Sequence, residues 1–189
     1  MRLTERVHQA LSELLAPGDC AIDATMGNGY DTLFLANSVG PKGKVWAFDI
    51  QEAALESTRK RLIDGESDHV TLVHSGHETM KAHLPEDAYG QIKAIVFNLG
   101  YLPGTDKSVT THAESTLSAI EAGLELLSPT GAIHILCYTG HSEGYSEWQQ
   151  LQEWMSQQAP EKAHIRLMSS FDEERRPPVW IELSRRLPA

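Results

Sequence analysis

Short apolar segments that alternate with helical ones restrict the fold of this chain more than any other feature of its sequence. Five of them have the length and composition of buried strands: DCAIDAT (19–25), KVWAFDI (44–50), HVTLVHS (69–75), QIKAIVFNL (91–99) and AIHILCY (132–138). Strands that alternate with helices form a parallel sheet that helices cover on both faces. The sequence therefore predicts an α/β fold.

The last two predicted strands break this alternation. AHIRLMS (163–169) and PVWIELS (178–184) follow a helix predicted at 146–157, and too few residues separate them for another helix. The final strand must then run antiparallel to the one before it, because a parallel connection needs a crossover. Since there is neither a repeat nor a linker, we expect one domain over residues 1–189, with residues 1–16 as an N-terminal helix packed on it.

Capping residues predict where two of the helices begin. Thr4 is a suitable N-cap for the first helix. Thr111 and Glu114 have the Thr-x-x-Glu form of a capping box, which would open a helix that ends at the turn 128–131.

Charge and cysteine content narrow the classes of function. The formal charge is −10 at pH 7, whereas proteins that bind nucleic acid usually present a basic face. Any RNA contact must therefore come from local clusters such as residues 59–61, 175–176 and 185–186, which could equally be ordinary solvated ends of helices and strands. Cys20 and Cys137 lie in apolar runs without the spacing of metal ligands, so we expect reduced core thiols and no metal site.

Membrane and export signals are missing from the sequence. No apolar run approaches the ~20 residues of a membrane span. Charges interrupt the first residues throughout, unlike a signal peptide. We expect a cytoplasmic protein with no membrane partner.

The loop after the first strand, DATMGNGYDT (23–32), has the composition of a ligand-binding turn. In open α/β sheets the ligand lies beyond the carboxyl ends of the strands. Gly27 and Gly29 allow a tight turn and close approach of the backbone. A nicotinamide dinucleotide is disfavoured, because Thr32 stands where the third glycine of its motif belongs and the Asp31 carboxylate would repel a pyrophosphate. Asp31 suits a ligand with a positive amino group.

The second strand ends on Asp49, where an acidic side chain accepts both hydroxyls of a ribose. A ribose, no phosphate and a cationic tail together describe S-adenosylmethionine. Asp23 and Asp31 could instead cap the first helix of the sheet, a role that is compatible with ligand binding.

The fourth strand delivers Asn98 to the same edge of the sheet. An amide oxygen and the backbone carbonyl of Leu99 are two acceptors that can hold the hydrogens of an amine and aim its lone pair. NLGY (98–101) resembles the Asn-Pro-Pro-Tyr signature of amino-directed methyltransferases, and Tyr101 could stack on a flat substrate. The alternatives are a strand-end cap for Asn98 and a core aromatic for Tyr101.

A protonated amine must lose a proton before it can attack. Asp106, or His141 in YTGH (138–141), could accept that proton. His77 lies at the end of the third strand, where a contact with the cofactor is favoured over a role as base. The other histidines have no motif around them and receive no role: 8, 69, 74, 83, 112 and 164.

Four segments resemble the small bacterial proteins known as rRNA methylases: DATMGNGYDTLFLA (23–36), VWAFDIQ (45–51), FNLGYLPGTDKSVTT (97–111) and YTGHSEGYSEW (138–148). The resemblance implies a Rossmann-like class I methyltransferase fold, a seven-stranded, mostly parallel sheet with an antiparallel last strand. It implies S-adenosyl-L-methionine as cofactor. It also implies tRNA as partner, bound through the anticodon stem-loop, with methylation of the amino group of 5-aminomethyl-(2-thio)uridine at the wobble position.

Most of the residues that we expect to contact the cofactor lie at the strand ends and in the glycine loop. They are Asp23, Thr25, Gly27, Asn28, Gly29, Asp31, Asp49, Gln51, Ser75, His77 and Asn98. The chain departs from the family in FDEERRPP (171–178), where family members tend to carry an asparagine-glutamine pair, so the family's substrate contacts in the last hairpin are not carried over to this chain.

The leading hypothesis is thus a methyltransferase that modifies tRNA, with two copies per assembly. One rival is a methyltransferase of rRNA or of a free small amine, which the negative charge favours. A second rival is a catalytically silent RNA-binding protein that retains the fold. Asp49 and NLGY argue against the second rival.

Overall fold

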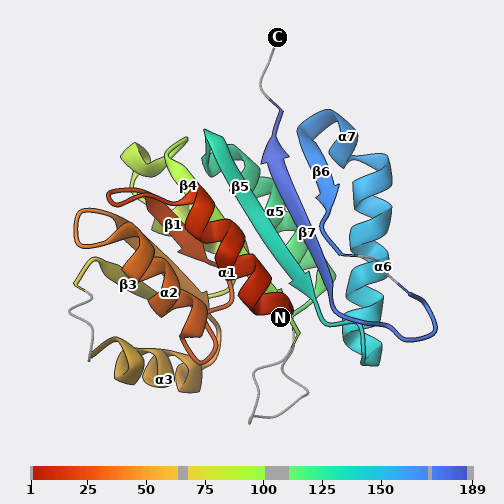
Figure 1. Ribbon diagram of the computed structural model, residues 1–189, viewed down its shortest axis with the longest axis horizontal. Coiled ribbons are helices and arrows are strands. Elements are labelled where there is room, and N and C mark those ends of the chain that lie inside the picture. Colours follow the sequence, from red (N-terminus) through yellow and green to blue (C-terminus); the bar gives the residue numbers. More distant parts are fainter. Residues whose placement is uncertain (1, 64–67, 101–110, 170–171, 187–189) are drawn as a thin grey trace.

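The computed structural model describes residues 2–63, 68–100, 111–169 and 172–186, and a seven-stranded sheet lies between helices at its centre (Figure 1). The strands are β1 (Cys20–Asp23), β2 (Lys44–Asp49), β3 (Val70–His74), β4 (Ile92–Leu99), β5 (Leu127–Cys137), β6 (Ala163–Leu167) and β7 (Val179–Arg185). The helices are α1 (Leu3–Leu14), α2 (Tyr30–Val39), α3 (Glu52–Ile63), α4 (Met80–His83), α5 (Ala113–Leu126), α6 (Ser142–Gln157) and α7 (Ala159–Lys162). Two short 3-10 turns, η1 (His77–Thr79) and η2 (Glu86–Ala88), flank α4.

The strand order is β3-β2-β1-β4-β5-β7-β6. The first five strands pair in parallel. β7 is antiparallel to both of its neighbours, β5 and β6, as the short final connection predicted. In Figure 1, β5 points down and β7 points up.

Alternate residues of the strands supply two apolar layers, one on each face of the sheet. Ala21 and Val45 belong to the layer under α1 and α2, together with Val7, Leu11 and Leu35 of those helices. The next residues along the two strands, Ile22 and Trp46, belong to the opposite layer. That layer also contains a further residue of β2 and side chains from α4, α5 and α6: Phe48, Met80, Ile120 and Trp148. The period-two pattern of each strand therefore fixes which helices cover which face.

Both predicted helix caps are wrong. α1 begins one residue before Thr4, and its N-cap is Arg2, whose backbone N–H donates to Glu5 Oε2 at 2.9 Å. Glu5 takes this position because it lies three residues after Arg2, the spacing of a capping box. The N-cap of α5 is His112, and the Thr111 hydroxyl donates to Glu147 Oε2 at 2.6 Å. The Thr111 hydroxyl, which was expected to cap the helix, is therefore bonded to the buried carboxylate of Glu147 instead.

Two boundaries differ from the sequence prediction, and one helix was not predicted. β5 starts directly after α5 and includes the segment 128–131, which was expected to be a turn. α6 begins at Ser142 instead of residue 146, because His141 caps it. The short helix α7 follows α6 and was not predicted.

Within the described ranges, no helix is both long and apolar enough to cross a membrane.

Candidate active site

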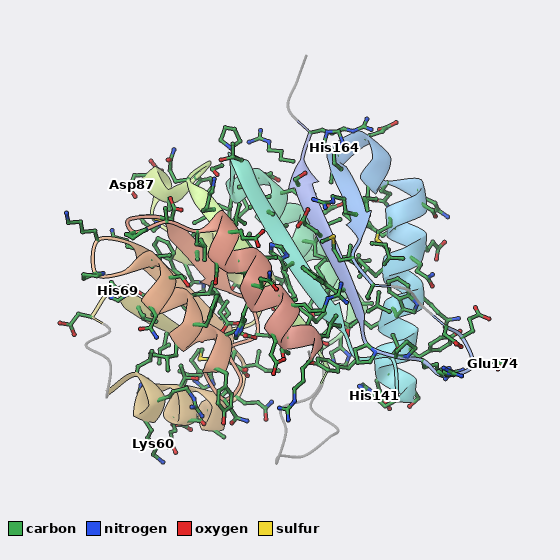
Figure 2. All side chains as sticks on the ribbon, viewed as in Figure 1. Lys60, His69, Asp87, His141, His164 and Glu174 are labelled. Atoms are coloured by element: carbon green, nitrogen blue, oxygen red, sulfur yellow. The ribbon has the colours of Figure 1, made fainter. Side chains whose placement is uncertain are left out.

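The carboxyl ends of the parallel strands gather most of the residues that the sequence singled out. β1, β2, β4 and β5 are neighbours and all run the same way, so the loops that follow them meet at one edge of the sheet. In the view of Figure 2, His141 marks this lower edge and His164 the opposite one.

α3 holds the glycine loop from outside. Gly27 and Gly29 have φ angles of 50° and 78°, a region that residues with a side chain rarely adopt. A Cβ on Gly29 would lie 2.7 Å from Thr58 Oγ1, so helix and loop are in close contact there. Thr58 Oγ1 donates to the Gly27 carbonyl at 3.2 Å, and Arg61 Nε donates to the Asn28 carbonyl at 2.7 Å.

Asp23 fastens the end of β1 to the first turn of α2. It is fully buried, and its two oxygens accept from Thr25 N at 3.1 Å and from Thr32 Oγ1 at 2.6 Å. Burial, with the Asp31 charge adding to it, raises the pKa of Asp23 to about 7. Thr32, which broke the glycine motif, is thus the partner of a buried carboxyl. Asp23 thus supports the glycine loop from within the core.

Asp49 ties the end of β2 to the glycine loop. Its oxygens accept from Gly27 N at 3.1 Å and from Gln51 N at 2.9 Å. Each carboxylate oxygen has more than one acceptor site, so Asp49 can still bind hydroxyls of a ligand. The next residue, Ile50, is 57% exposed and gives this edge an apolar surface.

Asp31 links Asn98 to a residue that sequence reasoning missed. Asn98 Nδ2 donates to Asp31 Oδ2, and His8 Nε2 lies 2.5 Å from Asp31 Oδ1. The His8 ring stacks on Phe34 with ring centroids 4.0 Å apart. His8 comes from α1 and has no motif around it, so no sequence signal indicated it.

The contact with Asp31 orients the Asn98 amide. Its NH2 group faces the carboxylate, so Oδ1 points the other way and is an acceptor. Among the described residues, no donor binds that oxygen. The backbone N–H of Asn98 donates to Thr25 Oγ1 at 2.7 Å, which assigns Thr25 a role in holding the strand end.

Leu99 supplies the second predicted acceptor. Its carbonyl accepts a long hydrogen bond of 3.4 Å from Tyr138 N, and a carbonyl oxygen has a second lone pair for another donor. Tyr138 itself is 37% exposed, and burial, with the Asp31 charge adding to it, raises its pKa. Tyr101 and Asp106 lie outside the described residues.

His141 lies beside the end of β4 but in a capping role. A Cβ on Gly100 would be 3.7 Å from His141 Nε2. The other ring nitrogen, Nδ1, accepts from Gly144 N at 3.1 Å at the start of α6. A ring nitrogen that accepts carries no proton, so the neutral ring has its proton on Nε2. Nδ1 also lies 3.4 Å from Glu143 Oε2, and the predicted role of His141 as base stays a prediction.

Ser75 and His77 both lie in the segment that follows β3. The buried His77 ring is bound through Nδ1 to the Ala24 carbonyl at 3.1 Å and packs edge-on against Phe97. Burial lowers its pKa, so the ring is neutral. Its Nε2 has no partner among the described residues and remains an acceptor. Ser75 Oγ accepts from Thr79 Oγ1 at 3.0 Å.

A groove of about 710 Å³ lies elsewhere, on the face of β5, β7 and β6 next to α1. Arg166 and Glu182 line it and pair with each other at 2.9 Å. The groove lies along the strands, whereas the predicted site residues lie at the strand ends.

Comparisons with known proteins agree on one family. The model of the family described as "Putative rRNA methylase" matches residues 45–184. The chain is 40% identical to the chloroplastic tRNA (mnm(5)s(2)U34)-methyltransferase of Arabidopsis thaliana over 155 residues, which are 77% of this chain and 56% of that protein. It thus spans little more than half the length of that relative.

Solved structures match over nearly the whole chain. A protein of Clostridium thermocellum that bears the same family name is 33% identical with a TM-score of 0.90, and 98% of each chain is covered. A protein of Streptococcus mutans, named as a methyltransferase and solved in complex with SAH, is 34% identical with a TM-score of 0.83, again over 98% of each chain. The predicted Rossmann-like class I methyltransferase fold is confirmed.

Proposed function

Because the chain belongs to this rRNA methylase family, we propose that it is an S-adenosylmethionine-dependent N-methyltransferase of tRNA. Its substrate is the amino group of 5-aminomethyl-(2-thio)uridine at the wobble position, bound through the anticodon stem-loop. One observation carries the proposal: the Asn98 amide is held by Asp31 at the end of β4 so that its oxygen is available as an acceptor. The name of the Arabidopsis relative supports the choice of substrate.

The residues at the strand ends fit the cofactor. Asp49 presents carboxylate oxygens beside the glycine loop, and His77 Nε2 is a buried acceptor without a partner in the described ranges. Bound here, S-adenosylmethionine would supply an electrophilic methyl group. The remaining predicted contacts, from Asp23, Thr25, Gly27, Asn28, Asp31, Gln51, Ser75 and Asn98, are part of this proposal.

The chain itself positions the amine. The Asn98 Oδ1 and Leu99 carbonyl oxygens each accept one hydrogen of the amino group, so the nitrogen lone pair is directed away from both. Both acceptors stand at the end of one buried strand, and Asp31 prevents the amide from turning its NH2 group to the substrate. An NH2 group in that place would repel the amine hydrogens.

Local cations must hold the RNA, since the chain as a whole is acidic. Arg61 lies beside the glycine loop with its guanidinium 3.6 Å from the Tyr30 ring centroid, and Tyr30 is 64% exposed. Arg175 is 86% exposed in the connection before β7. These two arginines are the proposed contacts with the phosphates of the anticodon loop. A homodimer is also part of the proposal, and light scattering of the purified protein tests it.

Three substrates test the function with purified protein and labelled S-adenosylmethionine. They are an anticodon stem-loop with 5-aminomethyluridine at the wobble position, the same stem-loop with unmodified uridine, and the free 5-aminomethyluridine nucleoside. We expect label only in the first, found as 5-methylaminomethyluridine by mass spectrometry.

The other possible results would each support one of the rival hypotheses. Label in the free nucleoside at an equal rate would favour the small-amine enzyme, which the negative charge supports. Label in an rRNA transcript, added as a fourth substrate, and in none of the other three would favour a base methylase of rRNA. Cofactor binding without any transfer would indicate a silent RNA-binding protein.

A further inference from the structure

Gly100, the residue after β4, is fixed by Thr111 across the connection to α5. Gly100 N donates to Thr111 Oγ1 at 3.0 Å, and Thr111 N donates to the Gly100 carbonyl at 3.0 Å. Both polar groups of the glycine backbone are therefore bound to a single residue.

The Thr111 hydroxyl also makes a second hydrogen bond, to Glu147. Because its oxygen accepts from Gly100, the hydroxyl proton is free to be donated, and it goes to Glu147 Oε2 at 2.6 Å. The other carboxylate oxygen, Oε1, accepts from Thr116 Oγ1 of α5 at 2.6 Å. Glu147 belongs to α6 and is only 3% exposed.

A buried carboxylate is an unusual residue to keep in a core, because burial disfavours its charge. Burial raises the pKa of Glu147, while the two hydroxyl donors and the nearby His112 and His141 act in the opposite direction. An ionised carboxylate only accepts, which matches the two hydroxyls that donate to it. The buried carboxylate thus accepts from the two threonines that lie on either side of the start of α5, Thr111 and Thr116.

We call the hydrogen-bonded series Gly100–Thr111–Glu147 the relay. The relay determines the direction of the Leu99 carbonyl. No cis peptide bond occurs in the described residues, so the Leu99 carbonyl and the Gly100 N–H point in opposite directions in one planar unit. Thr111 holds the N–H end, and the carbonyl end points toward β5, where Tyr138 N lies 3.4 Å away. Turning this peptide would break the hydrogen bond to Thr111.

We propose that Glu147 is a positioning residue for methyl transfer, which acts through Thr111 to aim the Leu99 carbonyl at the substrate amine. This inference rests on the proposed function, because it assigns the Leu99 carbonyl to the amine. It predicts that loss of the relay lowers turnover and leaves binding of the cofactor unchanged, since neither Glu147 nor Thr111 bonds to the glycine loop or to Asp49.

Four variants separate positioning from support of the fold. Glu147→Leu, which has no acceptor, and Thr111→Val break the relay. Thr111→Ser keeps its hydroxyl, and Thr116→Val removes the equivalent bond to the same carboxylate on the side away from Gly100. We expect the first two to lower kcat on the modified stem-loop by about 10- to 100-fold, because small misplacements at a reacting centre have effects of this size. Thr111→Ser and Thr116→Val should stay within about threefold of the wild type. The KM for RNA and the Kd for S-adenosylhomocysteine should change by less than about threefold in all four.

Amide hydrogen exchange gives a readout that needs no activity. The Gly100 N–H should exchange faster in Glu147→Leu and Thr111→Val, and at the wild-type rate in Thr116→Val. Equal losses of kcat in Thr111→Val and Thr116→Val, or unchanged exchange at Gly100, would overturn the inference. If the wild type transfers no methyl group to amines, the proposed function fails, and the exchange at Gly100 still decides whether Glu147 positions this peptide.

Discussion

At the scale of single residues, Asn98 and Asp49 have separable roles. Asn98→Ala removes the acceptor for the amine but leaves the glycine loop intact, so we expect turnover to fall by at least ~100-fold with the affinity for cofactor within a few-fold. Asp49→Ala removes a charged acceptor next to the loop and should weaken that affinity by about tenfold or more. Calorimetric titration with S-adenosylhomocysteine and single-turnover rates measure the two quantities. The reverse pattern would show that the roles are exchanged.

His8 offers a test of the contact that orients Asn98. His8→Ala deprives Asp31 of one donor, which loosens the carboxylate that holds the amide, and kcat should fall by about three- to tenfold. His8→Gln retains a donor on a side chain of similar reach and should recover part of the loss. A change in cofactor affinity with no change in kcat would instead place His8 among the residues that bind the cofactor.

The sequence predicts the site residues whose position follows from the strand ends. Asn98 and Asp49 end strands of recognisable pattern, so their meeting at one edge follows from topology. His8 meets Asp31 only because α1 packs across the sheet, a tertiary contact that no local pattern announces. The function of His141 depends on which ring nitrogen caps α6, and that is decided by a hydrogen bond and not by residue type.

At the scale of the elements, the tight contact between the glycine loop and α3 predicts a stability difference between two glycines. Gly29→Ala meets both an unfavourable φ of 78° and the Thr58 atoms within 3 Å, whereas Gly90→Ala has a similar φ of 72° and open space. A left-handed conformation costs a residue with a side chain roughly 1–2 kcal/mol. We expect Gly90→Ala to lose about that much stability and Gly29→Ala clearly more. Urea unfolding measures both, and equal losses would contradict a close approach of α3.

Element type was easier to predict than element ends. The strands and most of the helices follow from apolar periodicity, which packing on the sheet enforces. The ends depend on competition between polar groups: Glu5 captures the Arg2 backbone, and Glu147 captures the Thr111 hydroxyl. In both cases, a side chain that the predicted motif did not include holds the decisive bond.

At the scale of the whole molecule, two buried groups give opposite responses of stability to acid. The folded state binds a proton on Asp23 below about pH 7, whereas the unfolded chain does so only below about 3.8. Between these values the folded state holds more protons, so this group stabilises the fold as pH falls. His134 lies in β5, which pairs directly with β7, and it behaves in the opposite way: burial, with the Arg166 charge adding to it, lowers its pKa from 6.5 to about 4.

The same pH range therefore contains two opposed slopes. Between about pH 6.5 and 4 the unfolded chain binds a proton on His134 and the folded chain does not, so acid favours unfolding through this group. A variant that lacks one of the two groups should therefore show the pH dependence of stability that the other group causes. Asp23→Asn keeps the size of the side chain, and its free energy of unfolding should fall more steeply than that of the wild type on going from pH 6.5 to 4.5.

His134→Gln supplies the matched variant. Its free energy of unfolding should fall less over that interval than that of the wild type, or rise, since the stabilising Asp23 response then acts alone against the remaining groups. Urea unfolding at several pH values measures the slopes, and wild type, Asp23→Asn and His134→Gln should give three different ones. Parallel curves for all three proteins would mean that neither group changes its proton affinity on folding, and that the acid response of the molecule comes from its other titratable groups, such as His77 and Glu147.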